Sequence, residues 1–139
     1  MTYVMLVGTD AALLEGLAQS LAGLGHRPAV VGSIEEAREL GARRTPLVLV
    51  VDRALASATG AALLSIPICA GGARVLFRTA AVAPAVLQPT LQRAVLADLT
   101  LPLERHRLAA LVQSIGERAK ATGRGERPTT PNGAPTVEP

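Results

Sequence analysis

Short apolar runs alternate along the chain with segments in which leucine and alanine recur every three or four residues. The apolar runs are typical of parallel strands, which are covered on both faces and carry no polar alternation; they occupy residues 4–7, 28–31, 46–52, 74–78 and 97–101. The other segments are typical of amphipathic helices; they occupy residues 11–24, 33–43, 60–66, 84–93 and 103–121. A strand followed by a helix, five times over, predicts an α/β protein with a parallel sheet.

Residues at the segment boundaries agree with this pattern. Thr9 or Asp10 can cap the helix that begins at residue 11, and Gly25 can end that helix. Ser33 and Glu36 have the spacing of a capping box, in which each residue satisfies a free backbone N–H of the first helical turn. We therefore expect the first two helices to begin close to these residues.

The chain of 139 residues has the length of one domain. We assign residues 1–121 to that domain. From residue 122 onward the sequence consists mainly of Gly, Pro, Thr and charged residues, with almost nothing to bury. Such a composition does not offset the entropy lost on ordering, so residues 122–139 are predicted to be a disordered tail.

Composition excludes several classes of function. The formal charge is only +3, and Tyr3 and Phe77 are the two aromatic residues, so we expect no nucleic-acid partner. The single cysteine, Cys69, excludes a disulfide framework and a cysteine-based zinc site, and it fits a reducing compartment. No apolar run reaches the length of about 18 residues that a membrane helix needs. We expect a cytoplasmic protein that does not bind membranes.

One carboxylate stands out as candidate chemistry. The apolar run 46–52 ends on Asp52, and sites in open α/β sheets lie just beyond the carboxyl ends of the strands. Asp52 is therefore a candidate site residue. The alternative is that its carboxylate only caps the next turn.

Enzyme chemistry finds no support elsewhere in the sequence. No Gly-x-Ser-x-Gly elbow occurs, and His26 and His106 belong to different predicted elements. The Val7-Gly8-Thr9 turn lacks both the glycine spacing and the lysine of phosphate-binding loops. We expect a protein that is not an enzyme.

Together these residues resemble the receiver domains of bacterial two-component response regulators, over about residues 3–119. The resemblance rests on five landmarks in the family's order, namely 24–26 (Leu-Gly-His), the strand ending at the phosphoacceptor-equivalent Asp52, Leu55 with Ala56 and Gly60, Thr79-Ala80, and 101–103 (Leu-Pro-Leu). It implies a flavodoxin-like sheet of strand order 2-1-3-4-5 with helices on both faces. It also implies a histidine kinase or another signalling protein as partner.

The departures from the family concern its metal and phosphoryl ligands. Receivers carry an acidic pair where this chain has Gly8-Thr9, and Asp10 is the only carboxylate nearby. Two acids would then face the ion where receivers offer three, and Mg²⁺ requires charged oxygen ligands. The family's lysine is replaced by Leu101, which cannot pair with an anion. We therefore expect no cofactor and no Mg²⁺, and interpret the chain as a degenerate receiver, or pseudo-receiver.

The sequence leaves the roles of two residues of the degenerate pocket open, and we assign to this pocket Gly8, Thr9, Asp10, Arg53, Thr79 and Leu101. Arg53 either folds over Asp52 or is a solvated surface residue. Thr79 matches the family's switch threonine, but its hydroxyl could equally bond to the backbone. The aromatic partner of that threonine is replaced by Asp98, which puts the family's relay in doubt.

Three functions remain open at this stage. The first is an interaction module that works without phosphorylation, through docking or homodimerisation; its apolar contacts are expected from Leu87, Leu91 and Leu103, together with Leu101. The second is a working phosphoreceiver, in which Asp52 accepts a phosphoryl group from a histidine kinase. The third is a small-molecule sensor with a pocket at the strand ends, made less polar by Leu101.

Overall fold

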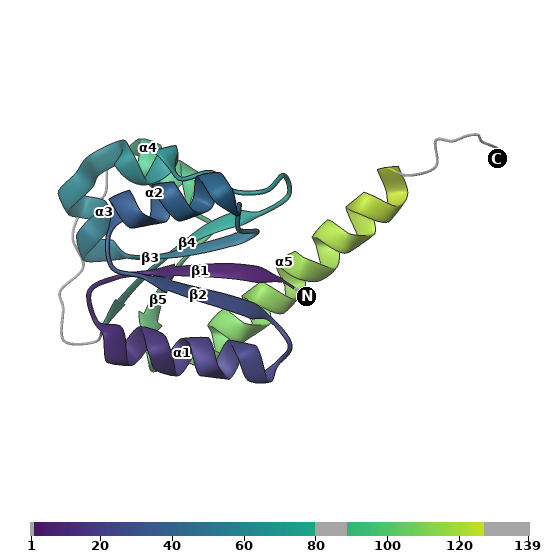
Figure 1. Cartoon of the computed structure of the whole chain (residues 1–139), viewed down its shortest axis with the longest axis horizontal. Coiled ribbons are helices and arrows are strands. Elements are labelled where there is room, and N and C mark those ends of the chain that lie inside the picture. Colours follow the sequence, from purple (N-terminus) through teal and green to yellow (C-terminus); the bar gives the residue numbers. More distant parts are fainter. Residues whose placement is uncertain (1, 80–88, 127–139) are drawn as a thin grey trace.

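Five parallel strands form one sheet with the order β2-β1-β3-β4-β5 in a computed structural model, which describes residues 2–79 and 89–126 (Figure 1). The strands are β1 (Tyr3–Val7), β2 (Arg27–Val31), β3 (Val48–Asp52), β4 (Ala73–Thr79) and β5 (Ala97–Leu101). The helices are α1 (Ala11–Gly23), α2 (Ile34–Arg43), α3 (Arg53–Thr59), the 3₁₀ helix η1 (Gly60–Ser65), α4 (Pro89–Ala94) and α5 (Arg105–Glu126). The predicted fold and strand order are confirmed.

The sheet is buried on both faces, with α1 and α5 on one side and α2, α3 and α4 on the other (Figure 1). Successive residues of each strand point to opposite layers. On β1, Val4 and Leu6 pack in the layer of α1 and α5, whereas Met5 and Val7 pack in the layer of α2, α3 and α4. This double burial explains why the strands are continuous apolar runs.

The N-caps predicted for the first two helices are confirmed, and the Glu36 side chain of the predicted capping box reaches the N–H of Gly32 in place of that of Ser33. Asp10 is the N-cap of α1, and its Oδ1 accepts the backbone N–H of Leu13 at 3.1 Å. The Ser33 hydroxyl accepts the N–H of Glu36 at 3.1 Å, and the Glu36 carboxylate accepts the N–H of Gly32 at 2.9 Å. These contacts satisfy backbone donors that have no partner within the helix.

The third and the last helix have other bounds than those predicted. A helix was expected only from residue 60, but α3 begins directly after β3, because the Asp52 carboxylate accepts the N–H of Ala54 at 2.9 Å and so caps the first turn. The described part of the fourth helix begins at Pro89, and residues 84–88 of the prediction lie outside the described residues. The last helix continues to Glu126, so the first five residues of the predicted tail are helical.

No helix within the described ranges is long and apolar enough to cross a bilayer.

Candidate functional site

The carboxyl ends of β1, β3, β4 and β5 bring the predicted site residues to one edge of the sheet. Gly8 follows β1, while Asp52, Thr79 and Leu101 are the last residues of their strands. The strand register pairs Asp52 with Phe77 and Thr79 with Leu101. Since alternate residues share a face, Asp52, Phe77, Thr79 and Leu101 all lie on the side of α1 and α5. The sheet thus gathers the residues that the sequence singled out.

Asp52 is partly buried and acts as the cap of α3. Its Oδ1 accepts the Ala54 N–H at 2.9 Å. Asp52 can therefore be both a site residue and a cap. One carboxylate oxygen caps the helix, and the residue lies at the end of its strand, where sites of such sheets are found. A carboxylate has further lone pairs beyond that one hydrogen bond.

Gly8 is packed tightly between Asp52 and the core. A Cβ atom added at Gly8 would lie 3.3 Å from Cδ1 of Leu14, 3.3 Å from Cζ of Phe77 and 3.4 Å from Cβ of Asp52. Contacts of that length require the neighbours to move by a few tenths of an ångström. The position where receivers carry an acid is thus closed to a side chain unless core residues shift.

Phe77 is a site residue that the sequence reasoning did not single out. Its ring is almost completely buried and belongs to the core beneath α1 and α5. Phe77 is two residues from Thr79 on the same strand, which places it on the same face. That spacing was visible in the sequence, but the closeness of Phe77 to Gly8, the residue that follows β1, was not.

Asp10 is an exposed helix cap, and Thr9 beside it is also exposed. The hydrogen bond from Leu13 holds one Asp10 oxygen at the start of α1. Among the residues that the structure describes, no group of three or more His, Cys, Asp or Glu side chains could hold a metal ion.

Arg53 forms an ion pair with Asp98 on β5. The Arg53 side chain is only 13% exposed, so the interpretation as a solvated surface residue is wrong. The first residue of α3 is instead tied to the second residue of β5. By strand alternation Asp98 shares a face with Leu76, its register partner, and this is the face opposite to Thr79. Asp98 therefore takes part in an electrostatic contact where the family places an aromatic ring.

Two residues expected to be available for docking are buried. Leu91 is 1% exposed and packs in the layer of α2, α3 and α4, and Leu101 is fully buried beneath α1 and α5. Leu91 is the buried side chain through which α4 packs on the sheet. Leu103 is 74% exposed, as the prediction requires, and Leu87 lies outside the described residues.

Burial of Leu101 also bears on the sensor hypothesis. That hypothesis needs an apolar side chain that lines a cavity at the strand ends. Leu101 instead fills the core together with Leu99 and Leu108. It contributes to packing between β5 and α5 and not to an open pocket.

Solved receiver domains share this fold. No protein-family model matches the chain, and no curated protein matches it. A signal receiver domain from Vibrio parahaemolyticus is similar with a TM-score of 0.68 and 19% identity over 90% of this chain and 97% of that one. A CheY-like receiver domain from Methylobacillus flagellatus has a TM-score of 0.68 and 19% identity, covering 83% and 98% of the two chains. The pseudo-receiver domain of the CikA protein has a TM-score of 0.60 and 14% identity, covering 83% and 97%. The chain has the fold of response-regulator receiver domains.

Proposed function

We propose that this receiver-fold chain is a protein-interaction module of a signalling pathway that works without phosphorylation, and that it is not an enzyme. Its partner is a signalling protein, such as a histidine kinase, or a second copy of the chain. The proposal retains the cytoplasmic location expected from the sequence. The packing of Gly8 against Phe77 and Leu14 is the observation that carries it.

That packing bears directly on the metal. Phosphoryl transfer to a carboxylate depends on positioning and on neutralising charge, which Mg²⁺ and its acidic ligands supply. Beside Asp52 the chain has a glycine whose neighbourhood is filled by apolar groups, and the nearest acid, Asp10, caps a helix. These residues do not fit a magnesium site, so no step through the metal is proposed.

Position 101, where the family has the lysine that pairs with the phosphoryl group, also carries no cation. Leu101 stands at the lysine position of the family and is fully buried in the core. A leucine can neither pair with an anion nor donate a hydrogen bond. Asp52 keeps a structural role as the cap of α3, which accounts for its presence without phosphorylation.

The ion pair between Arg53 and Asp98 supports a single resting conformation. It ties the start of α3, next to Asp52, to β5 and needs no phosphoryl group on Asp52. In a module that does not switch, such a permanent contact holds the edge of the sheet in one arrangement. The exposed Leu103, just after β5, is then available to a partner at all times.

A titration with Mg²⁺ and then beryllofluoride, which mimics an aspartyl phosphate, tests the proposal. In amide NMR spectra of the full chain we expect no saturable shifts near Asp10, Asp52 and Thr79 at millimolar Mg²⁺. Saturable shifts there that extend to α5 would identify a working phosphoreceiver and refute the proposal.

The variant Asp52→Asn provides a second test. Asparagine keeps a carbonyl oxygen that can accept the Ala54 N–H, so the cap of α3 is retained. We expect this variant to bind a partner as tightly as the wild type. Loss of binding with an unchanged melting temperature would show that the charge of Asp52 matters, contrary to the proposal.

A further inference from the structure

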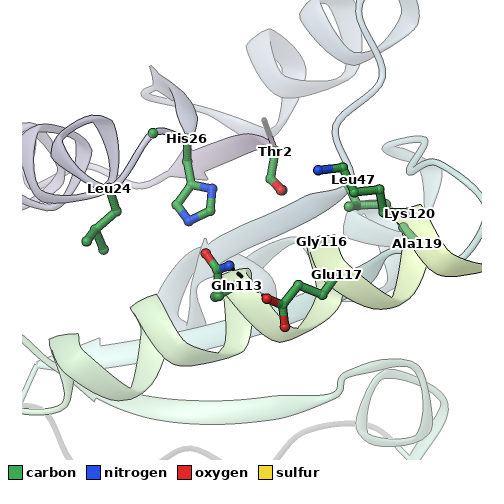
Figure 2. Close-up of a pocket in the computed structure, with 10 residues that line it drawn as sticks. Thr2, Leu24, His26, Leu47, Gln113, Gly116, Glu117, Ala119 and Lys120 are labelled. Atoms are coloured by element: carbon green, nitrogen blue, oxygen red, sulfur yellow. Dashed lines mark hydrogen bonds between the residues drawn. The ribbon is translucent and has the colours of Figure 1, made fainter.

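A cavity of about 450 Å³ lies at the edge of the sheet opposite to Asp52 (Figure 2). It is bounded by the residues just before β1, β2 and β3, namely Thr2, His26 and Leu47, and by α5. Its volume falls within the range of about 300–1,000 Å³ typical of small-molecule sites. None of its residues belongs to the candidate site described above.

His26 lines this cavity, and its imidazole ring has two buried nitrogen atoms without hydrogen-bond partners among the described residues. Buried polar atoms without partners are rare in proteins and indicate a missing partner. The backbone N–H of His26 donates to the Leu21 carbonyl at 3.0 Å, which fixes where the side chain begins. Figure 2 shows the imidazole pointing toward α5 between Leu24 and Thr2.

Two opposite charges line the facing wall on α5. Glu117 and Lys120 are both exposed residues of the cavity lining. The Gln113 side chain donates to the Glu117 carboxylate at 3.1 Å, which orients that carboxylate and leaves the Gln113 amide oxygen as an acceptor. Gly116 lies between Gln113 and Glu117 in the chain, and a side chain at this position would collide with the Thr2 hydroxyl.

We propose that this cavity binds a small zwitterion, with one ammonium and one carboxylate group, of the size of a free amino acid. The carboxylate of Glu117 would repel a simple anion, and the ammonium group of Lys120 would repel a simple cation. A zwitterion places its ammonium near Glu117 and its carboxylate near Lys120, so both charges are paired.

His26 supplies the remaining polar contact. A neutral imidazole offers one donor and one acceptor, which suit the carboxylate and the ammonium respectively. Because both nitrogens are shielded in this structure, the ring must turn about its side-chain torsions to bring one nitrogen into the cavity. Binding therefore moves His26 and satisfies a nitrogen that otherwise lacks a partner.

Amide NMR spectra of the full chain with pools of the twenty free amino acids test this proposal. Each amino acid is present at about 2 mM, which would occupy about two thirds of a site with a Kd of about 1 mM. We expect one pool to shift the amides of Gly25, His26 and Gly116 saturably, and to shift the ring nitrogens of His26. The N-acetylated methylamide of the same amino acid, which lacks both charges, should cause no shift.

Matched variants assign the contacts. Glu117→Gln and Lys120→Gln keep exposed polar side chains, and each should weaken binding about tenfold, the effect of one charge-assisted hydrogen bond. His26→Leu should lose binding yet remain as stable as the wild type, because the ring nitrogens have no hydrogen-bond partner within residues 2–79 and 89–126. Absence of saturable shifts with every pool, or equal shifts with the uncharged analogue, would overturn the proposal. The proposed function does not depend on this result, since the two sites lie at opposite edges of the sheet.

Discussion

The guanidinium of Arg53 and the carboxylate of Asp98 form an ion pair that joins α3 to β5, while β4 lies between β3 and β5 in the sheet. The two side chains are 13% and 35% exposed, so water screens their attraction only in part. The contact holds the first turn of α3, next to Asp52, in a defined position relative to β5.

Removing either partner of this ion pair should destabilise the protein. We expect Asp98→Ala to lower the free energy of unfolding by about 1–2 kcal/mol, between the values for exposed and buried pairs. Arg53→Ala should cost more, because Arg53 makes a further interaction. Urea unfolding of both variants and of the double variant measures their coupling.

Arg38→Ala is the matched control, since Arg38 is exposed on α2 and its loss should change stability by less than about 0.5 kcal/mol. A coupling energy near zero in the double-mutant cycle would mean that the ion pair contributes nothing to the fold.

Adding a methyl group at Gly8 should crowd the candidate site. Gly8→Ala places a Cβ atom 3.3 Å from both Leu14 and Phe77, and overpacking of this kind costs about 1–3 kcal/mol. In contrast, Gly16→Ala on the exposed side of α1 meets no atom within 4 Å and should stabilise the protein by about 0.5–1 kcal/mol.

Thermal unfolding of the two variants gives the comparison directly. Phe77→Leu in the Gly8→Ala background should recover part of the loss if Phe77 is the obstacle. Equal stability of Gly8→Ala and the wild type would show that position 8 has room for a side chain.

Restoring the family's lysine should fail because position 101 is part of the core. Leu101→Lys places an ammonium group where the leucine is fully buried, and we expect a loss of about 3 kcal/mol or more. Leu103→Lys makes the same chemical change two residues later, at a side chain that is 74% exposed. Its effect on stability should stay within about 0.5 kcal/mol.

Chemical denaturation gives the free energy of unfolding of both lysine variants. A loss at position 101 alone would show that burial of the side chain causes it. Similar stabilities for the two would indicate that the strand end can open to let the lysine reach water.

Glu104 should make stability depend on pH in the acidic range. Its carboxylate accepts the Thr100 N–H at 2.8 Å and pairs with Arg107, and these contacts lower the pKa of Glu104 below its ordinary value. As pH falls, Glu104 therefore takes up its proton in the unfolded chain at a higher pH than in the folded protein. The contribution of Glu104 to stability is complete above pH 4.5 and is lost as pH falls through the lowered pKa of the folded state.

Unfolding free energies measured from about pH 7 to about pH 3 test this dependence. Glu104→Gln keeps an oxygen for the Thr100 N–H but carries no charge, so its stability should fall less steeply with acid than that of the wild type. Arg107→Gln should reduce the dependence without abolishing it, because the Thr100 hydrogen bond is the largest single cause of the lowered pKa. Identical acid profiles for Glu104→Gln and the wild type would contradict the assignment.

Local patterns in the sequence were enough to predict the five strands and most of the helices, although the helix α3 lies where the sequence predicted a loop. Each strand is a short apolar run, and the N-caps Asp10 and Ser33 bond to backbone groups three residues away, so both features can be recognised locally. The position of Asp52 at a strand end follows from the same local pattern. Resemblance of five spaced landmarks to receiver domains then predicted the strand order, which pattern alone does not determine.

Only the tertiary structure decided what surrounds Asp52. The contact of Gly8 with Phe77 and the ion pair of Arg53 with Asp98 join residues from different strands and helices, and no spacing in the sequence reports such distances. The burial of Leu91 depends likewise on how α4 packs on the sheet. Hydrophobic periodicity identifies an apolar face, but whether a given side chain on it is covered depends on elements that arrive from elsewhere in the chain.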